Sequence, residues 1–91
     1  MGVLAIDQGT SATKAVVLDD GGVVRAEVEV PIHPVAGPGG SVEQDPIEMW
    51  DSVVAAGRQA IGIAGVAIEA VGLGNQGESV LAWDPVSGEP R

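Results

Sequence analysis

Hydrophobic and polar positions in the first third of the chain predict three consecutive strands. Residues 3–6 and 15–18 are apolar runs of the kind found in buried strands. Apolar and charged residues alternate from residue 24 to residue 30, which predicts a strand with one buried face and one solvated face. Polar turns at residues 7–14 and 19–22 separate these runs, so we expect an antiparallel meander.

The pattern then gives way to a loop, and a helix follows it. Prolines and glycines predict a surface loop over residues 31–44, and we assign the single histidine, His33, to the surface of that loop. Asp45 is a suitable N-cap and Pro46 suits the first helical position. Glu48, three residues after the cap, completes a predicted capping box.

Helical spacing of apolar residues continues to about Ala64. It predicts that Trp50, Val54 and Ile61 pack against the sheet. The next apolar run, residues 69–74, reads as a strand that is reached through a helix and is therefore parallel to the first strand.

The last part of the chain predicts one more hairpin. A polar turn at residues 75–78 leads into a fifth strand at residues 79–83, which a turn at residues 84–88 ends. The element order is β-β-β-α-β-β, an α/β layer with a mixed sheet. With 91 residues, the chain forms at most one small domain.

Composition narrows the possible functions. The net charge of −9 argues against nucleic-acid binding and against a polybasic membrane contact. The absence of cysteine fits a reducing compartment, and no signal peptide or membrane span is apparent, so we expect a cytoplasmic protein. Phe and Tyr are also absent, which leaves Trp50 and Trp83 as the only large aromatic anchors.

The turn after the first strand has the chemistry of a phosphate site. A glycine there lets the backbone approach an anion, hydroxyls donate hydrogen bonds, and a lysine adds positive charge. The carboxylate suggests a hydrated Mg²⁺ between it and the phosphate. The residues concerned are Asp7, Gly9, Thr10, Ser11, Thr13 and Lys14. The alternative is an ordinary hairpin with a polar turn.

A glycine-rich segment, residues 72–77, matches the dinucleotide fingerprint G-x-G-x-x-G, but no helix can follow it. We interpret the turn instead as a hydrogen-bonding cluster of Asn75, Gln76 and Glu78, suited to the hydroxyls of a polyol or sugar. If strands one and four are parallel, this cluster lies at the same sheet edge as Asp7 and Thr10. A polar turn without a ligand remains the alternative.

Both turns together resemble the FGGY family of carbohydrate kinases. Three blocks carry the resemblance: residues 5–11, residues 40–46 with Trp50, and residues 74–79 with 82–84. The third of these blocks is most similar to glycerol kinases. The resemblance implies a ribonuclease-H-like sheet of the actin/hexokinase/Hsp70 ATPase superfamily. It also implies ATP and Mg²⁺ as cofactors and a polyol or sugar as the acceptor.

The resemblance also implies roles for single residues. Asp7 would lie near Mg²⁺ or its water, and Gly9, Thr10 and Ser11 would contact the ATP phosphates. Lys14 stands where glycerol kinases usually have an arginine, so it keeps the charge but loses the planar fork.

The substrate side is implied in the same way. Glu78 matches a carboxylate that binds substrate hydroxyls, with Gln76 beside it. Gly77 stands where glycerol kinases have an arginine, which leaves the choice between glycerol and another polyol or sugar open.

Members of this family are several times longer than 91 residues. We therefore expect residues 1–91 to be an N-terminal fragment of the first kinase domain, inactive alone, with the catalytic base beyond residue 91. Its sheet and helix faces are uncovered, which would allow association into a homo-oligomer. The alternative function is a non-catalytic, actin-like nucleotide-binding or interaction module.

Overall fold

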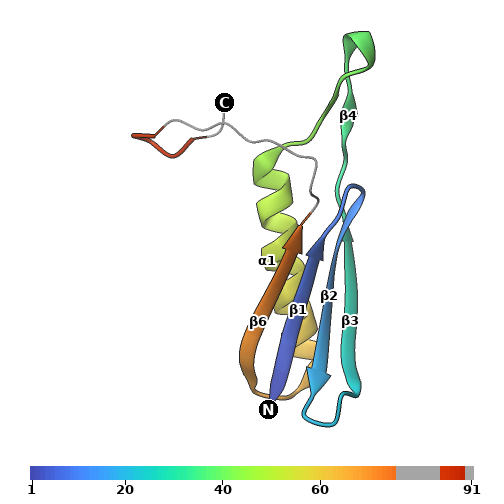
Figure 1. Cartoon of the computed structure of the whole chain (residues 1–91), viewed down its shortest axis with the longest axis vertical. Helices are drawn as coiled ribbons and strands as arrows, with labels where there is room; N and C mark the ends of the chain where they lie inside the picture. Colours follow the sequence, from blue (N-terminus) through green and yellow to red (C-terminus); the bar gives the residue numbers. More distant parts are fainter. Residues whose placement is uncertain (76–84, 90–91) are drawn as a thin grey trace.

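The computed structural model describes residues 1–75 and 85–89, and most of these form a mixed sheet with a helix on one face (Figure 1). The elements in chain order are β1 (Gly2–Gln8), β2 (Ala12–Asp19), β3 (Val24–Pro31), β4 (Val35–Ala36), the 3-10 helix η1 (Pro38–Gly40), β5 (Val42–Glu43), α1 (Pro46–Ala64) and β6 (Ile68–Asn75).

The four long strands lie in the order β3-β2-β1-β6. β1 pairs antiparallel with β2, and β2 pairs antiparallel with β3, which confirms the predicted meander. β6 pairs parallel with β1 after the crossover through α1, as predicted. The carboxyl ends of β1 and β6 therefore lie at one end of the sheet, beside the β1–β2 turn (Figure 1).

One face of β1, β2 and β3 packs against α1 and forms the core. Alternate residues of these strands are buried, and the residues between them are more exposed, as the period of two requires. The buried core side chains are all aliphatic: Leu4, Ile6, Ala15, Val17, Ala26, Val28, Ala56 and Ala60. Because half of them are alanine, including both from α1, the helix can lie close to the sheet.

The predicted buried face of the helix was wrong. Trp50 is 63% exposed and Ile61 is 41% exposed, while Val54 is only partly buried. The residues that face the sheet are Ser52, Ala56, Gly57 and Ala60.

The close approach of α1 to β1 explains why small residues of the helix, and not Trp50 or Ile61, face the sheet. A Cβ atom added to Gly57 would lie 3.4 Å from Ile6 Cδ1 and 3.6 Å from Leu4 Cδ2. At this separation glycine, alanine and serine fit against the sheet, whereas a tryptophan would force the helix outward.

The ends of α1 agree with the sequence prediction, except for one half of the capping box. Asp45 Oδ1 accepts a hydrogen bond from Ile47 N at 2.9 Å, and the helix ends at Ala64, followed by Gly65 in a left-handed conformation (φ 66°). The carboxylate of Glu48 does not return to the cap; it contacts the backbone N–H and ring of His33 instead.

The predicted surface loop contains regular structure. β4 and β5 form a two-stranded antiparallel hairpin around η1, with Gly39 and Gly40 at positive φ in its bend. Figure 1 shows this hairpin projecting beyond the sheet at the end where the β1–β2 turn lies.

Part of the predicted C-terminal hairpin lies outside the described residues. This applies to the strand at residues 79–83 with Trp83, and to all of the turn after Asn75. Within residues 1–75 and 85–89, no helix has the length and apolar character needed to cross a bilayer.

Candidate functional site

The β1–β2 connection is a tight turn over residues 9–11. Gly9 N donates to Ala12 O at 2.9 Å, which closes the turn. A Cβ atom at position 9 would lie 3.0 Å from the same carbonyl oxygen, which is tighter than most real Cβ contacts. A side chain at position 9 would therefore crowd the hydrogen bond that closes the turn.

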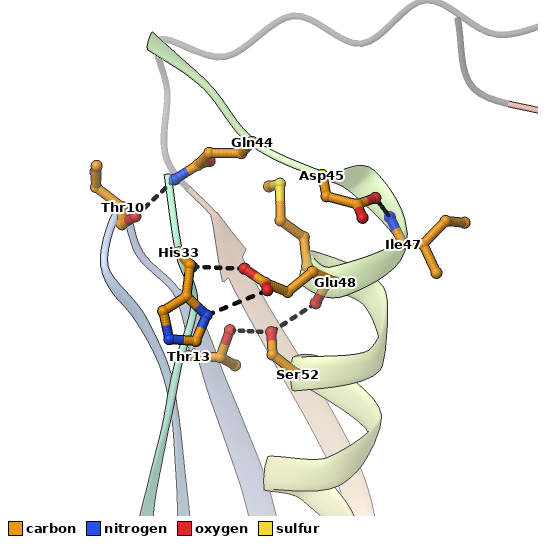
Figure 2. Close-up of polar contacts among 9 residues, drawn as sticks. Thr10, Thr13, His33, Gln44, Asp45, Ile47, Glu48 and Ser52 are labelled. Atoms are coloured by element: carbon orange, nitrogen blue, oxygen red, sulfur yellow. Dashed lines mark hydrogen bonds and ion pairs between the residues drawn. The ribbon is translucent and has the colours of Figure 1, made fainter. Parts of the chain in front are cut away.

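Three successive carbonyl groups of this turn are held by hydrogen bonds from the protein. Gly9 O accepts from Gln8 Nε2 at 2.8 Å, Thr10 O accepts from Gln44 Nε2 at 2.6 Å, and Ser11 O accepts from Ile32 N at 3.0 Å. Figure 2 shows the Gln44 side chain reaching the turn from the segment before α1. In a trans peptide the N–H points opposite to the C=O, so each anchored carbonyl also fixes the direction of the following N–H.

Asp7 and Lys14 are cross-strand neighbours on the face of the sheet that α1 does not cover. They are directly paired in the β1–β2 register, and both are exposed. Lys14 Nζ lies 3.6 Å from Glu27 Oε1 in a largely exposed ion pair, which contributes little to stability. The carboxylate and the ammonium group thus flank the strand ends that carry the turn.

Thr13 does not belong with the exposed hydroxyls, contrary to the sequence prediction. It is fully buried, and its Oγ1 lies 2.7 Å from Ser52 Oγ. Ser52 Oγ donates to Met49 O at 2.6 Å, so the Thr13 hydroxyl is the donor between the two (Figure 2). Thr10 and Ser11 remain exposed at the turn.

The end of β6 lies directly beside this turn. In the parallel register Asp7 pairs with Gly74, and Gln8 pairs with Asn75. The expectation that the second polar turn begins at the same sheet edge is therefore confirmed up to Asn75. Gln76, Gly77 and Glu78 lie outside the described residues.

A contact between His33 and Glu48 also lies near this end of the sheet, and sequence reasoning missed it. Glu48 Oε1 accepts from the backbone N–H of His33 at 2.5 Å, and Oε2 lies 3.2 Å from Nδ1 of the ring. These hydrogen bonds, first that from the backbone N–H, lower the pKa of Glu48. His33 is on the surface, as expected, but it is tied to the helix.

The residues present fit a magnesium-bound phosphate better than a metal held by protein ligands alone. Among residues 1–75 and 85–89 there is no cluster of three or more acidic, histidine or cysteine side chains that could bind an ion. Asp7 is a single exposed carboxylate beside a turn with exposed hydroxyls. Mg²⁺ usually keeps several waters and binds through one or two carboxylates plus phosphate oxygens.

Comparison with known proteins gives a consistent family. Residues 2–90 match the model of the FGGY family of carbohydrate kinases, N-terminal domain. The chain is 40% identical over 91 residues to a glycerol kinase of Methylibium petroleiphilum and 42% identical to one of Corynebacterium efficiens. Each alignment covers 97% of this chain but only 18% of the relative, so the chain spans about a fifth of their length.

Solved structures of two kinases share the fold. Plasmodium falciparum glycerol kinase with ADP superposes with a TM-score of 0.89 at 28% identity, covering 98% of this chain and 19% of that chain. A ligand-bound xylulose kinase from Lactobacillus acidophilus gives 0.90 at 25% identity, covering 98% and 18%. These neighbours confirm the expected actin-like, ribonuclease-H-like α/β fold. The chain belongs to the FGGY family of carbohydrate kinases.

Proposed function

We propose that residues 1–91 form the N-terminal part of the first domain of an ATP-dependent carbohydrate kinase. The reaction transfers the γ-phosphate of ATP to a hydroxyl of glycerol or of a related polyol or sugar. The observation that carries this proposal is the register of β1 and β6, which sets Gln8 beside Asn75. It brings the phosphate-type turn and the start of the sugar-type turn to one sheet edge, where open α/β sheets bind ligands.

On the nucleotide side, we assign the phosphates to Gly9, Thr10 and Ser11. The two hydroxyls are exposed there, and the turn carbonyls are bound to protein donors, so their negative ends are kept from the anion. Asp7 would hold Mg²⁺ through water, and the ion would neutralise charge on the phosphates. Lys14 would add positive charge, since its exposed pairing with Glu27 costs little to break.

On the acceptor side, we assign Gln76, Gly77 and Glu78. A carboxylate accepts hydrogen bonds from two hydroxyls at once, and an amide both donates and accepts. Gly77 supplies no cation, so glycerol and a larger polyol or sugar remain equally compatible acceptors. The similarity to glycerol and xylulose kinases supports this range of substrates.

Phosphoryl transfer requires the acceptor, the metal and the γ-phosphate to be positioned together. We assign the catalytic base and the adenine pocket to sequence beyond residue 91, because relatives are about five times longer. The isolated 91-residue chain should accordingly show no phosphotransfer. We propose a cytoplasmic location for the protein; the expected use of ATP and the lack of cysteine are compatible with it.

The test is an assay of the full-length protein with Mg·ATP and a panel of polyols and sugars that includes glycerol. We expect at least one acceptor to stimulate ATP turnover and to become phosphorylated. ATP turnover that no acceptor stimulates, or phosphotransfer by the purified 91-residue chain alone, would contradict the proposal.

A further inference from the structure

Gln44 connects the entry of α1 to the β1–β2 turn. Its Nε2 donates to Thr10 O at 2.6 Å across 34 positions of sequence (Figure 2). Because the carbonyl oxygen can only accept, the amide nitrogen must be the group that faces it. The residue is half-buried, and the hydrogen bond itself is exposed.

The position of Gln44 is itself well defined. It follows β5 directly and precedes Asp45, the residue that caps α1. Gln44 therefore lies between a paired strand and a capped helix start, and its amide is held by the hydrogen bond to Thr10 O. The Gln44–Thr10 hydrogen bond thereby connects the β1–β2 turn to the start of α1.

We propose that Gln44 is a positioning residue for the phosphate-binding turn, an inference that rests on the proposed binding of ATP phosphates at residues 9–11. The carbonyl of Thr10 carries partial negative charge and would repel a phosphate if it rotated toward the ligand. Gln44 keeps this carbonyl on the protein side, and the Ser11 N–H of the same peptide unit therefore points the other way. In this proposal Gln44 acts through the orientation of this one peptide unit and not through a contact with the ligand.

The neighbouring anchors explain why Gln44 is the informative position. The Gly9 carbonyl is held by the side chain of the adjacent Gln8, and the Ser11 carbonyl is held by a backbone N–H of Ile32. The Gln8 side chain is buried near the core, so its replacement would disturb folding. Gln44 is the long-range side-chain donor among the three and can be changed with less disturbance of the core.

The experiment replaces Gln44 in the full-length protein by a side chain of the same length without the amide, Gln44→Met. Gln59→Met, at an exposed position of α1, is the matched control. Loss of one neutral hydrogen bond should weaken Mg·ATP binding about 2- to 10-fold, while the KM for the acceptor stays within about twofold. Gln44→Glu should weaken Mg·ATP binding further, because a carboxylate beside the carbonyl repels it. Gln59→Met should change neither constant.

A structural readout accompanies the binding measurement. Thr10–Ser11 is the only Thr–Ser peptide in the 91 residues, so carbonyl-labelled threonine and nitrogen-labelled serine report this peptide unit by NMR. A Ser11→Ala sample identifies the signal by its loss. The signal should shift in Gln44→Met and stay in place in Gln59→Met.

Each outcome decides the proposal. A signal that does not move in Gln44→Met overturns it, and so does a moved signal with unchanged Mg·ATP affinity. Equal losses of ATP and acceptor binding would show a merely structural role and would also overturn it. If the wild-type protein binds Mg·ATP but phosphorylates no acceptor, the proposed kinase function fails while the role of Gln44 is still judged by its affinity. If it binds no Mg·ATP, both fail.

Discussion

Thr13 and Ser52 form a buried hydroxyl pair between β2 and α1, three positions along the chain from the exposed Thr10. The sequence places Thr10, Ser11 and Thr13 in one polar segment, and nothing in their chemistry separates them. The start of β2 separates them, because Thr10 and Ser11 precede the strand, whereas Thr13 lies within it on the face that meets α1. Thr13 consequently joins the helix interface, whereas Thr10 and Ser11 are exposed at the turn.

This pair yields a prediction about stability. Ser52→Ala leaves the buried Thr13 hydroxyl without its acceptor and should lower the free energy of unfolding by about 1–3 kcal/mol. Adding Thr13→Val removes the unsatisfied donor and should recover much of this loss. Urea unfolding of both variants measures the effect, with Gln59→Ala as an exposed control expected to change it by less than about 0.5 kcal/mol. A Ser52→Ala variant as stable as the wild type would refute the pairing.

At the scale of elements, Glu48 joins the first turn of α1 to the segment that follows β3. Its carboxylate accepts from the backbone N–H of His33 and lies against the ring, so the helix start and the end of the meander are tied together (Figure 2). The sequence predicted instead that the Glu48 carboxylate would accept a hydrogen bond from the backbone N–H of Asp45, as in a capping box. The capping box is a local preference, and here a partner 15 residues away competes for the same carboxylate.

The lowered pKa of Glu48 gives this link a pH dependence. A carboxyl with a lowered folded-state pKa adds stability at pH values above its pKa in the unfolded chain, and this stability is lost as the pH falls through the folded-state pKa. Stability should therefore decline in acid, and Glu48→Gln should make the decline shallower. Unfolding curves from pH 7 to pH 3, with Glu29→Gln as the surface control, measure this. An acid decline of unchanged steepness in Glu48→Gln would contradict the link.

For the whole molecule, local patterns predicted the order and direction of β1, β2, β3, α1 and β6, because alternation, turn chemistry and caps act between near neighbours. They did not predict which stripe of α1 meets the sheet. Trp50 and Ile61 are apolar at helical spacing, but the close approach at Gly57 decides the packing, and that distance is a property of the assembled sheet and helix.

In the candidate site, too, contacts between sequence neighbours could be predicted and long-range contacts could not. Asp7, Gly9, Thr10, Ser11 and Lys14 are adjacent in sequence, so their gathering at the end of β1 was predictable. The Gln44 contact with Thr10 spans 34 positions, and no local pattern signals it.

Among described residues, α1 packs over β1, β2 and β3, and this leaves Val71 and Leu73 of β6 61% and 64% exposed. Strand alternation alone would have predicted one buried face there.

The central claim is that the turns after β1 and β6 bind the phosphate donor and the acceptor as two halves of one kinase site. The measurement that tests it most directly is the steady-state kinetics of Glu78→Ala in the full-length protein, with Glu69→Ala, at the other end of β6, as the control. Loss of a charged hydrogen bond should raise the KM for the acceptor about 10- to 150-fold and leave the affinity for Mg·ATP within about twofold. An unchanged acceptor KM with intact ATP binding would contradict the account and would favour a nucleotide-binding module without a carbohydrate site.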